Sequence, residues 1–574
     1  MAFQRKFNLT NIFLKMNKKA NLRLNSLVKR LNIFKPPMPI LRLIKRAIFV
    51  DLEESYVFMD IDLLSSIIFN ASIISSLIFL PLISALTFWA IVTPAQAIIL
   101  ATLPVICPIV LVNLWLLEKR VERKGGIQRE MPGFVLLMSI FGGMNRFERG
   151  LNCIFNELHD LFSSISKEIT LIFRNLIFFM SDFRKAVVNS VKKQPNKEFR
   201  DYMLGYVDAL TKGSGVREFT YRQMDRFLEE IEEKWELLER NIQSQMDAAF
   251  LFFGFFPAVL SMLIVMLDLE QIMLTLALFA LFYVLSSLVL ITYLDEVQVQ
   301  MRDEIDVRRW APVSIAMAFT SAALLSLSPG LVEATLSIAL PIAIGLAPMT
   351  LSVFRQIKEI NELEESLKRF LRDLVELMRV GYSIKSSIRR LNRENYGRKF
   401  DKILSSFISG LKSGRSGMDI VNSLRIRSKL VKTAFAVIAA IIEVGGGLSE
   451  VERLENFTLK YLDRKKRTFR NSLISLIVAI FIPLLGLFGI KVFEEILRSL
   501  VTIPQLPIPS AITPLNIDVV ITLSKFLILL SSIITGVILG KMISGTVKNT
   551  IYLSICLIIY SVGLSLIQLV RISV

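Results

Sequence analysis

The sequence is poor in the residues on which metal centres most often depend, because only one of its 574 residues is a histidine, His159. The three cysteines, Cys107, Cys153 and Cys556, lie too far apart along the chain to predict a zinc site or a disulfide framework. We therefore expect no metal site, with His159 on a helix surface and the three cysteines in the core.

A phosphate-binding loop and intramembrane charges are missing as well. The glycine-rich stretches 212–215 and 410–417 lack a lysine and a hydroxyl at the spacing that holds phosphate and magnesium in a nucleotide-binding loop. The long apolar stretches carry no acidic or arginine side chain at mid-depth, which proton relays and ion pathways usually require. The absence of such side chains makes a transporter less favoured. Without a metal site or a nucleotide-binding loop, we predict no catalytic residue and no cofactor, and we expect that the protein is not an enzyme.

Charge is absent from long stretches of a chain that is 53% hydrophobic and 21% charged. A bilayer core of about 30 Å needs roughly 20 apolar residues per helix. The stretches of that length are 63–117, which holds two helices, and 248–267, 271–294, 310–332, 334–354, 471–490, 519–540 and 549–570. In 519–540 the single cation, Lys525, is near one end, where its stem can reach the headgroups. The pattern predicts about nine transmembrane helices.

Orientation follows from the basic residues, because short loops rich in Lys and Arg stay in the cytoplasm. The first 50 residues contain 12 Lys or Arg and no acidic residue, which predicts a cytoplasmic amino terminus. An odd number of spans then places Val574 outside the cell membrane. The same rule accounts for the net charge of +18, so we expect no nucleic-acid partner.

The amino-terminal region, residues 1–62, alternates basic and apolar residues between Phe13 and Phe34 and is interrupted by Pro36, Pro37 and Pro39. One interpretation is an interfacial helix on anionic lipid. The other is a helix packed on the protein's own cytoplasmic domains. We expect no cleaved signal peptide, because the basic stretch before the first apolar run is too long.

Two charged regions, 118–247 and 355–470, have apolar residues at intervals of three and four and lack alternating β-branched residues, so both are predicted to be helical. We interpret Glu362, Glu364 and Glu365 as a solvated helix face. The basic run 464–467 lies at a predicted membrane boundary, which favours a headgroup anchor over a contact with a partner.

The two charged regions align as copies. Residues 134–138 (FVLLM) match 374–378 (LVELM), and each segment is followed by a glycine turn, at Gly142 and Gly143 or at Gly381. Farther along, 212–215 matches 444–447. Each copy is thus predicted to be a span, a helical domain and a second span.

The span after each copy contains a proline, Pro257 or Pro483. A proline inside a helix removes a backbone hydrogen bond and produces a kink. The kinks are interpreted as possible hinges or, equally, as static bends. The three glycines 445–447 interrupt a helical pattern and predict a sharp corner between two helices.

These observations predict an all-α, polytopic membrane protein with two cytoplasmic helical-bundle domains in tandem repeat. The predicted domains are 1–62, the basic amphipathic cytoplasmic region; 63–117, transmembrane helices 1–2; 118–247, the first cytoplasmic helical domain; 248–354, transmembrane helices 3–6; 355–470, the second cytoplasmic helical domain; and 471–574, transmembrane helices 7–9.

The sequence resembles the F-domain family of type II secretion and type IV pilus systems, and within it the archaeal membrane platform proteins of archaella and adhesion pili. The resemblance rests on residues 371–381, Gly410, Gly414 and residues 434–447, followed by the proline-bearing span. The helix-corner residues of this motif are Gly381, Gly410, Gly414, Gly445, Gly446 and Gly447. The first copy departs from it, because 182–191 lacks glycines that match Gly410 and Gly414.

The resemblance implies a platform in the cytoplasmic membrane that couples a hexameric secretion ATPase to the extraction of pilin or archaellin subunits, without a catalytic residue. The expected partners are that ATPase, the pilin subunits, membrane lipids and further copies of the chain. Two other classes fit an all-helical membrane protein without catalytic residues: a transporter or channel, and a membrane-bound receptor or scaffold.

Overall fold

The computed structural model describes residues 37–48, 54–55, 61–88, 94–178, 182–213, 215–249, 282–295, 300–326, 334–502 and 514–569. Within these ranges the chain forms helices joined by turns and contains no strand, which confirms the all-helical prediction. It divides into two compact units, Met1–Arg123 and Lys124–Val574, and each is described by itself.

The first unit contains α2 (Met38–Ala47), α3 (Ile61–Phe88) and the first part of α4 (Pro94–Gly143). Pro37 precedes α2, whose first turn tolerates proline because its N–H groups need no helical partner. A small core joins the three helices through Ile44, Leu64, Ile68 and Leu116. The predicted basic stripe between Phe13 and Phe34 lies outside the described residues.

The second unit begins with a group of helices that we call the first bundle, residues 124–249. Its members are the end of α4, α5 (Phe147–Asn156), α6 (Ser163–Phe178), α7 (Phe183–Val191), α8 (Lys197–Lys212) and α9 (Val216–Ala249). Partly buried Glu130 of α4 accepts hydrogen bonds from the N–H groups of Ser164 and Ile165 and so caps the first turn of α6. Burial nevertheless raises the pKa of Glu130, and these hydrogen bonds oppose the shift.

The second bundle, residues 355–470, also has six helices, and their lengths follow an order similar to that in the first bundle. They are the charged part of α13 (Ala334–Arg379), α14 (Ile384–Leu391), α15 (Arg398–Lys412), α16 (Gly417–Ser423), α17 (Lys429–Val444) and the first part of α18 (Leu448–Thr502). The two bundles share one continuous hydrophobic core, which extends from Ile127 in α4 to Leu462 in α18 and beyond.

Ion pairs fix the directions of the long helices. The pairs Arg379–Glu452 and Lys465–Glu364 join opposite ends of α13 and α18, so these helices are antiparallel. In contrast, α9 and α18 are parallel: Tyr221 donates a hydrogen bond to Glu450, and farther along, Thr468 donates one to Glu239. Residues at about the same distance from the start of each helix therefore lie side by side.

The basic run 464–467 and the glutamates of α13 meet in this arrangement. Lys465 binds Glu364, which is buried, Lys466 pairs with Glu365, and Arg464 pairs with Glu232 of α9 at 3.4 Å. The predicted solvated face is thus wrong for Glu364, which is buried, whereas Glu362 is exposed and Glu365 is partly exposed. The predicted headgroup anchor is wrong for Arg464 and Lys465, because each lies opposite an acidic side chain of a neighbouring helix.

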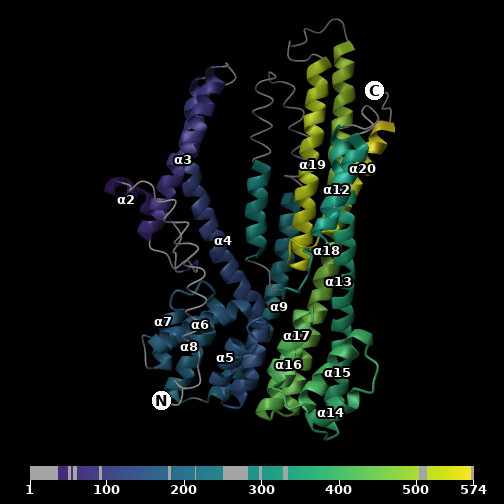
Figure 1. Cartoon of the computed structure of the whole chain (residues 1–574). Helices are drawn as coiled ribbons and strands as arrows, with labels where there is room; N and C mark the ends of the chain where they lie inside the picture. Colours follow the sequence, from purple (N-terminus) through teal and green to yellow (C-terminus); the bar gives the residue numbers. More distant parts are fainter. Residues whose placement is uncertain are drawn as a thin grey trace. The chain divides into compact units, whose positions relative to one another are not determined.

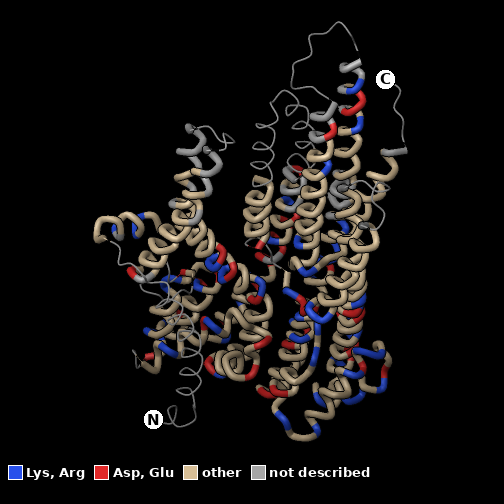
Figure 2. The backbone as a smooth tube through the Cα atoms, turned by 45° about the horizontal axis from the view of Figure 1, so that its top comes forward, with Lys and Arg blue, Asp and Glu red and all other residues tan. Residues whose placement is uncertain are grey.

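Apolar helices occupy the rest of the described second unit: α12 (Ala311–Ser326), the first part of α13, the second part of α18, α19 (Pro514–Ser544) and α20 (Ile551–Leu569). Figure 1 shows α12, α19 and α20 at the opposite end of this unit from α14, α15 and α16. In Figure 2 the charged residues gather on the bundles, whereas the apolar helices are largely uncharged.

Three helices in the described residues are long and apolar enough to cross a membrane, at Leu64–Pro81, within Thr335–Arg379 and at Ile521–Ser544. Shorter apolar helices are Phe282–Asp295, Ala311–Leu325 and Ile551–Ile567. They mark a multi-pass membrane protein. The count of nine spans stays a prediction, because window 248–267 and the first part of 271–294 lie outside the described residues. The predicted location of Val574 also stays a prediction, because Val574 is not among the described residues.

Candidate functional site

Three helices of the second bundle run in the same direction and end close together. Phe435 of α17 lies beside Phe370 of α13, and Phe400 at the start of α15 contacts both rings. From this level α13, α15 and α17 run away from the apolar segment of α13. The end of α13 lies about 37 Å beyond Phe354, at 1.5 Å per residue. This distal end of the second bundle brings together the glycines that the sequence singled out.

Each of the three helices is closed by a glycine with positive φ: Gly381 at 102°, Gly414 at 75° and Gly445 at 87°. At Gly381 the N–H of Tyr382 donates to the carbonyl of Leu377, and the glycine N–H donates to that of Met378. At Gly414 the same two-bond pattern recurs. It satisfies carbonyl groups that would otherwise lack a partner at a helix end, and glycine adopts it without steric cost.

The corner between α17 and α18 uses all three predicted glycines. After Gly445 leaves the helix, the N–H of Gly446 donates to the carbonyl of Ile441, and the N–H of Gly447 donates to the carboxylate of Glu450 at 2.8 Å. Burial favours the neutral form of Glu450, but hydrogen bonds from Gly447, Ser449 and Tyr221 outweigh it and lower the pKa of Glu450. The corner is therefore fixed by a charge as well as by backbone geometry.

Gly410 has a different role from the other corner glycines. It lies inside α15, where a Cβ atom would come within 2.7 Å of the Ile420 side chain on α16. Gly417 likewise lets α16 approach α17, since a Cβ there would lie 2.8 Å from that of Ala439. These glycines allow three short helices to pack tightly. Gly417 was not predicted as a site residue, because its contact with α17 is not visible in a one-dimensional pattern.

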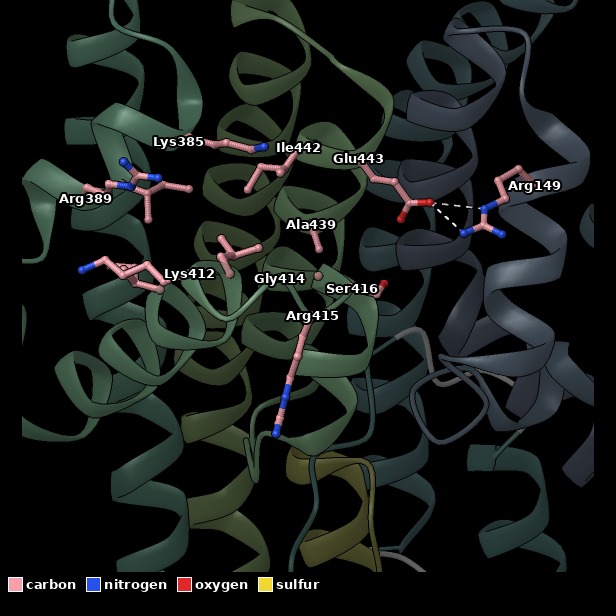
Figure 3. Close-up of a pocket in the computed structure, with 14 residues that line it drawn as sticks. Arg149, Lys385, Arg389, Lys412, Gly414, Arg415, Ser416, Ala439, Ile442 and Glu443 are labelled. Atoms are coloured by element: carbon pink, nitrogen blue, oxygen red, sulfur yellow. Dashed lines mark hydrogen bonds and ion pairs between the residues drawn. The ribbon is translucent and has the colours of Figure 1, made fainter.

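A cavity of about 650 Å³ opens beside Gly414 between α14, α15 and α17. Its rim carries four exposed cations, Lys385, Arg389, Lys412 and Arg415, and the described residues provide no ion pair for any of them. Figure 3 places Lys385, Arg389 and Lys412 together on one side of this basic pocket. These four cations were not predicted as site residues, although the spacing of Lys385 and Arg389 places them on one helix face.

The opposite wall of the basic pocket joins the two bundles. Arg149 of α5 binds Glu443 of α17 through two nitrogens, at 2.8 and 3.2 Å (Figure 3). Glu157 lies next to this pair and accepts a hydrogen bond from Ser416. Burial and the neighbouring Asp419 raise the pKa of Glu157. The acidic side chains of the pocket thus lie on this wall, and the opposite side is left positive.

The remaining predicted residues lie elsewhere. Pro483 is inside α18, which continues through it to Thr502, and Pro257 lies outside the described residues. His159 is exposed beside Asp160. Cys153 and Cys556 are buried, but Cys107 is exposed, so its assignment to a core is wrong. No group of three or more His, Cys, Asp or Glu side chains suited to a metal occurs in the part of the chain that the structure describes.

The comparisons with known proteins bear on this bundle. Residues 370–493 match the family model for the type II secretion system (T2SS), protein F, from the last turns of α13 to the part of α18 that follows Pro483. No curated protein and no solved structure matches the chain. The matched residues include all six predicted corner glycines, Gly381 to Gly447. Residues 370–493 therefore form a domain similar to T2SS protein F, as the glycine motif predicted.

Proposed function

We propose that this protein is a platform of the cytoplasmic membrane on which a type IV pilus-like filament, an archaellum or an adhesion pilus, is assembled. In this role it couples a cytoplasmic secretion ATPase to the extraction of pilin subunits from the membrane. The observation that carries the proposal is the match of residues 370–493 to T2SS protein F, in a chain with several apolar helices. The proposed orientation has the bundles and the amino terminus in the cytoplasm.

Both bundles are proposed to be copies of one F-type domain. The first bundle, like the second, consists of a long incoming helix, four shorter helices and a long outgoing helix. The parallel contact of α9 with α18 supports this proposal, because equivalent helices of two copies meet at equivalent levels when a local two-fold axis runs between them.

The geometry suits a protein that transmits force. The helix α13 runs without interruption from its apolar segment to the distal end, and α18 returns from Leu448 to Thr502. Ion pairs between α9 and α18 and the shared core hold the bundles together. A displacement of the distal end is thus passed along continuous helices to the apolar segments.

The basic pocket is proposed to be the place where the ATPase docks. Four exposed cations without an ion pair among the described residues attract an acidic surface, and exposed charges act over about 8 Å at physiological ionic strength. Because these cations lie at the distal end of the second bundle, a bound ATPase would exert force at the end of α13 that is farthest from its apolar segment. Docking by charge predicts binding that weakens as salt increases.

The test measures binding of the cognate secretion ATPase to the full-length protein in nanodiscs, at low and high salt. A variant in which Lys385, Arg389, Lys412 and Arg415 are all changed to Gln should bind at least about tenfold more weakly at low salt. The matched control changes Arg393, Arg398, Lys402 and Arg425 to Gln, which removes the same charge from exposed positions that do not line the pocket.

The control should change binding by less than about threefold, because those cations act only through the net charge. Equal losses in the two variants would exclude a specific docking site. Unchanged binding of the pocket variant would exclude the pocket. If no ATPase binds to the unaltered protein at any salt concentration, the proposed platform function is wrong.

A further inference from the structure

A second cavity, of about 550 Å³, lies between α12 and α13, at the level where α12 begins and the apolar part of α13 meets its charged part. Four of its lining residues are apolar, Met317 on α12 and Ala347, Pro348 and Leu351 on α13, and we call them the apolar floor. Its mouth is lined by three arginines, one of them next to Trp310 at the start of α12. This interfacial groove is far along α13 from the basic pocket and has no part in the proposed docking.

The fold builds the groove with two contacts. Gly345 brings α13 so close to α12 that a Cβ atom would lie 2.6 Å from the Cβ of Ala318. The amide side chain of Gln356, which is buried, donates to the carbonyl of Asp306 and accepts from its N–H, each at 2.9 Å. This pair of hydrogen bonds fixes the loop before α12 and therefore the position of Trp310.

The mouth of the groove has an excess of positive charge. Arg309 and Arg355 are exposed, and neither forms an ion pair with the residues that the structure describes. Arg427, the third, pairs with Glu359 at 3.4 Å. The carboxylate of Asp306 accepts a hydrogen bond from the N–H of Arg308. Two arginines at the mouth therefore remain to bind an anion.

Each feature matches one part of a phospholipid. Arginine presents paired N–H donors to a phosphate group. Tryptophan favours the headgroup level of a membrane, and basic pockets between membrane helices bind anionic headgroups. The apolar floor is itself accessible to acyl chains, since Leu351 is 53% exposed and Met317 is 38% exposed.

We propose that the interfacial groove binds one anionic phospholipid, with its phosphate between Arg309 and Arg355, its glycerol region beside Trp310 and an acyl chain along Met317 and Leu351. A free phosphate would use the arginines but leave the apolar floor empty. A neutral lipid would fill the floor but leave both arginines without a counter-charge. The combination selects a lipid whose headgroup carries net negative charge.

The experiment uses the full-length protein, exchanged into neutral detergent and titrated with phosphatidylglycerol or phosphatidylcholine that carries bromine on its acyl chains. Bound lipid is counted by native mass spectrometry, and its place is read from quenching of tryptophan fluorescence. Phosphatidylglycerol should bind at least about tenfold more tightly than phosphatidylcholine. Changing both Arg309 and Arg355 to Gln should remove that preference.

The matched control changes Arg302 and Arg308 to Gln, two exposed arginines of the same loop that do not line the groove. It should keep the preference for phosphatidylglycerol. A second variant, Ala347→Trp, fills the apolar floor and should weaken binding of both lipids while leaving the arginines in place. Circular dichroism and gel filtration establish that each variant is folded.

Three results would overturn the proposal. Equal binding of the two lipids to the unaltered protein would mean that the groove holds ordinary annular lipid. Retention of the preference when Arg309 and Arg355 are both Gln would place the anion elsewhere. Competition by soluble glycerol phosphate at the same concentration as the lipid would identify a free-phosphate site. None of these results depends on the secretion ATPase, so the proposed function is tested separately.

Discussion

The two bundles end their incoming helices in the same way but with different residues. In the second bundle α13 is closed by Gly381, at φ 102°, and in the first α4 is closed by Asn145, at φ 54°. The hydrogen-bond pattern is shared, since Arg146 donates to the carbonyl of Phe141 as Tyr382 does to that of Leu377. Asparagine is the residue after glycine that best tolerates this conformation.

The surroundings of the two ends differ more than the turns do. In the first bundle Gly142 and Gly143 remain helical, and Cβ atoms there would collide with Thr220 and Tyr221 of α9 at 2.3 and 2.4 Å. In the second bundle nothing lies within 4 Å of a Cβ placed on Gly381. Similar sequence signals thus produce a packed end in one bundle and an open end in the other.

A glycine motif thus indicates where a helix ends, but it does not determine whether that end is packed against another helix or open. The open end of the second bundle leads to the basic pocket, and it belongs to the region that matches T2SS protein F. The end of the first bundle lies against its own outgoing helix. A docking role for the second bundle and a bracing role for the first follow from this difference as hypotheses.

The largest expected effect tests whether the bundles are independent. Phe435 is fully buried among the rings of Phe370, Phe400 and Phe407, and Phe435→Ala should destabilise the protein by about 3–5 kcal/mol. Because the core is continuous, proteolysis should then cleave both bundles. The matched substitution Phe199→Ala in the first bundle should do the same. Cleavage confined to the mutated bundle would contradict a shared core.

A smaller effect separates the two helix ends. Gly381→Ala places a side chain at positive φ and should cost about 1–2 kcal/mol, whereas Gly381→Asn should cost less. Asn145→Gly should change stability by only a few tenths of a kcal/mol, because the turn keeps its geometry. Thermal unfolding midpoints of the three variants in nanodiscs measure the order. If Gly381→Ala and Asn145→Gly lowered the unfolding midpoint equally, the positive φ of the turn would not be the cause of the loss of stability.

The smallest effect concerns pH at the contact between α9 and α18. The pKa of Glu450 is lowered in the folded protein, so its stabilising contribution is present above the unfolded pKa, near 4.5, and is lost as the pH falls through the folded value. Glu450→Gln should therefore be less stable than the unaltered protein at pH 7, by less than about 1 kcal/mol. The difference should shrink in acid. A difference that is constant from pH 7 to pH 3 would exclude this origin.

Much of the fold could be predicted from local patterns in the sequence. Apolar residues at helical spacing predicted the all-helical structure, and the apolar window 519–540 lies within α19. The turn after α4 was placed too early, at Gly142 and Gly143, because two adjacent glycines resemble a helix stop in a single sequence. The structure ends the helix after Gly143 and uses Asn145, since both glycines are needed for contact with α9.

The sequence by itself determined the features that depend on neighbours along the chain: the helices, their apolar or charged character, and the corners at residues 381, 414 and 445–447. Tertiary structure decided what each charge meets. Glu364 is buried against Lys465, while Lys385 and Arg389 remain exposed at a pocket, although all four belong to charged helices. The reason is physical: helix formation depends on residues within about one turn, whereas an ion pair or a cavity depends on which distant helix packs opposite.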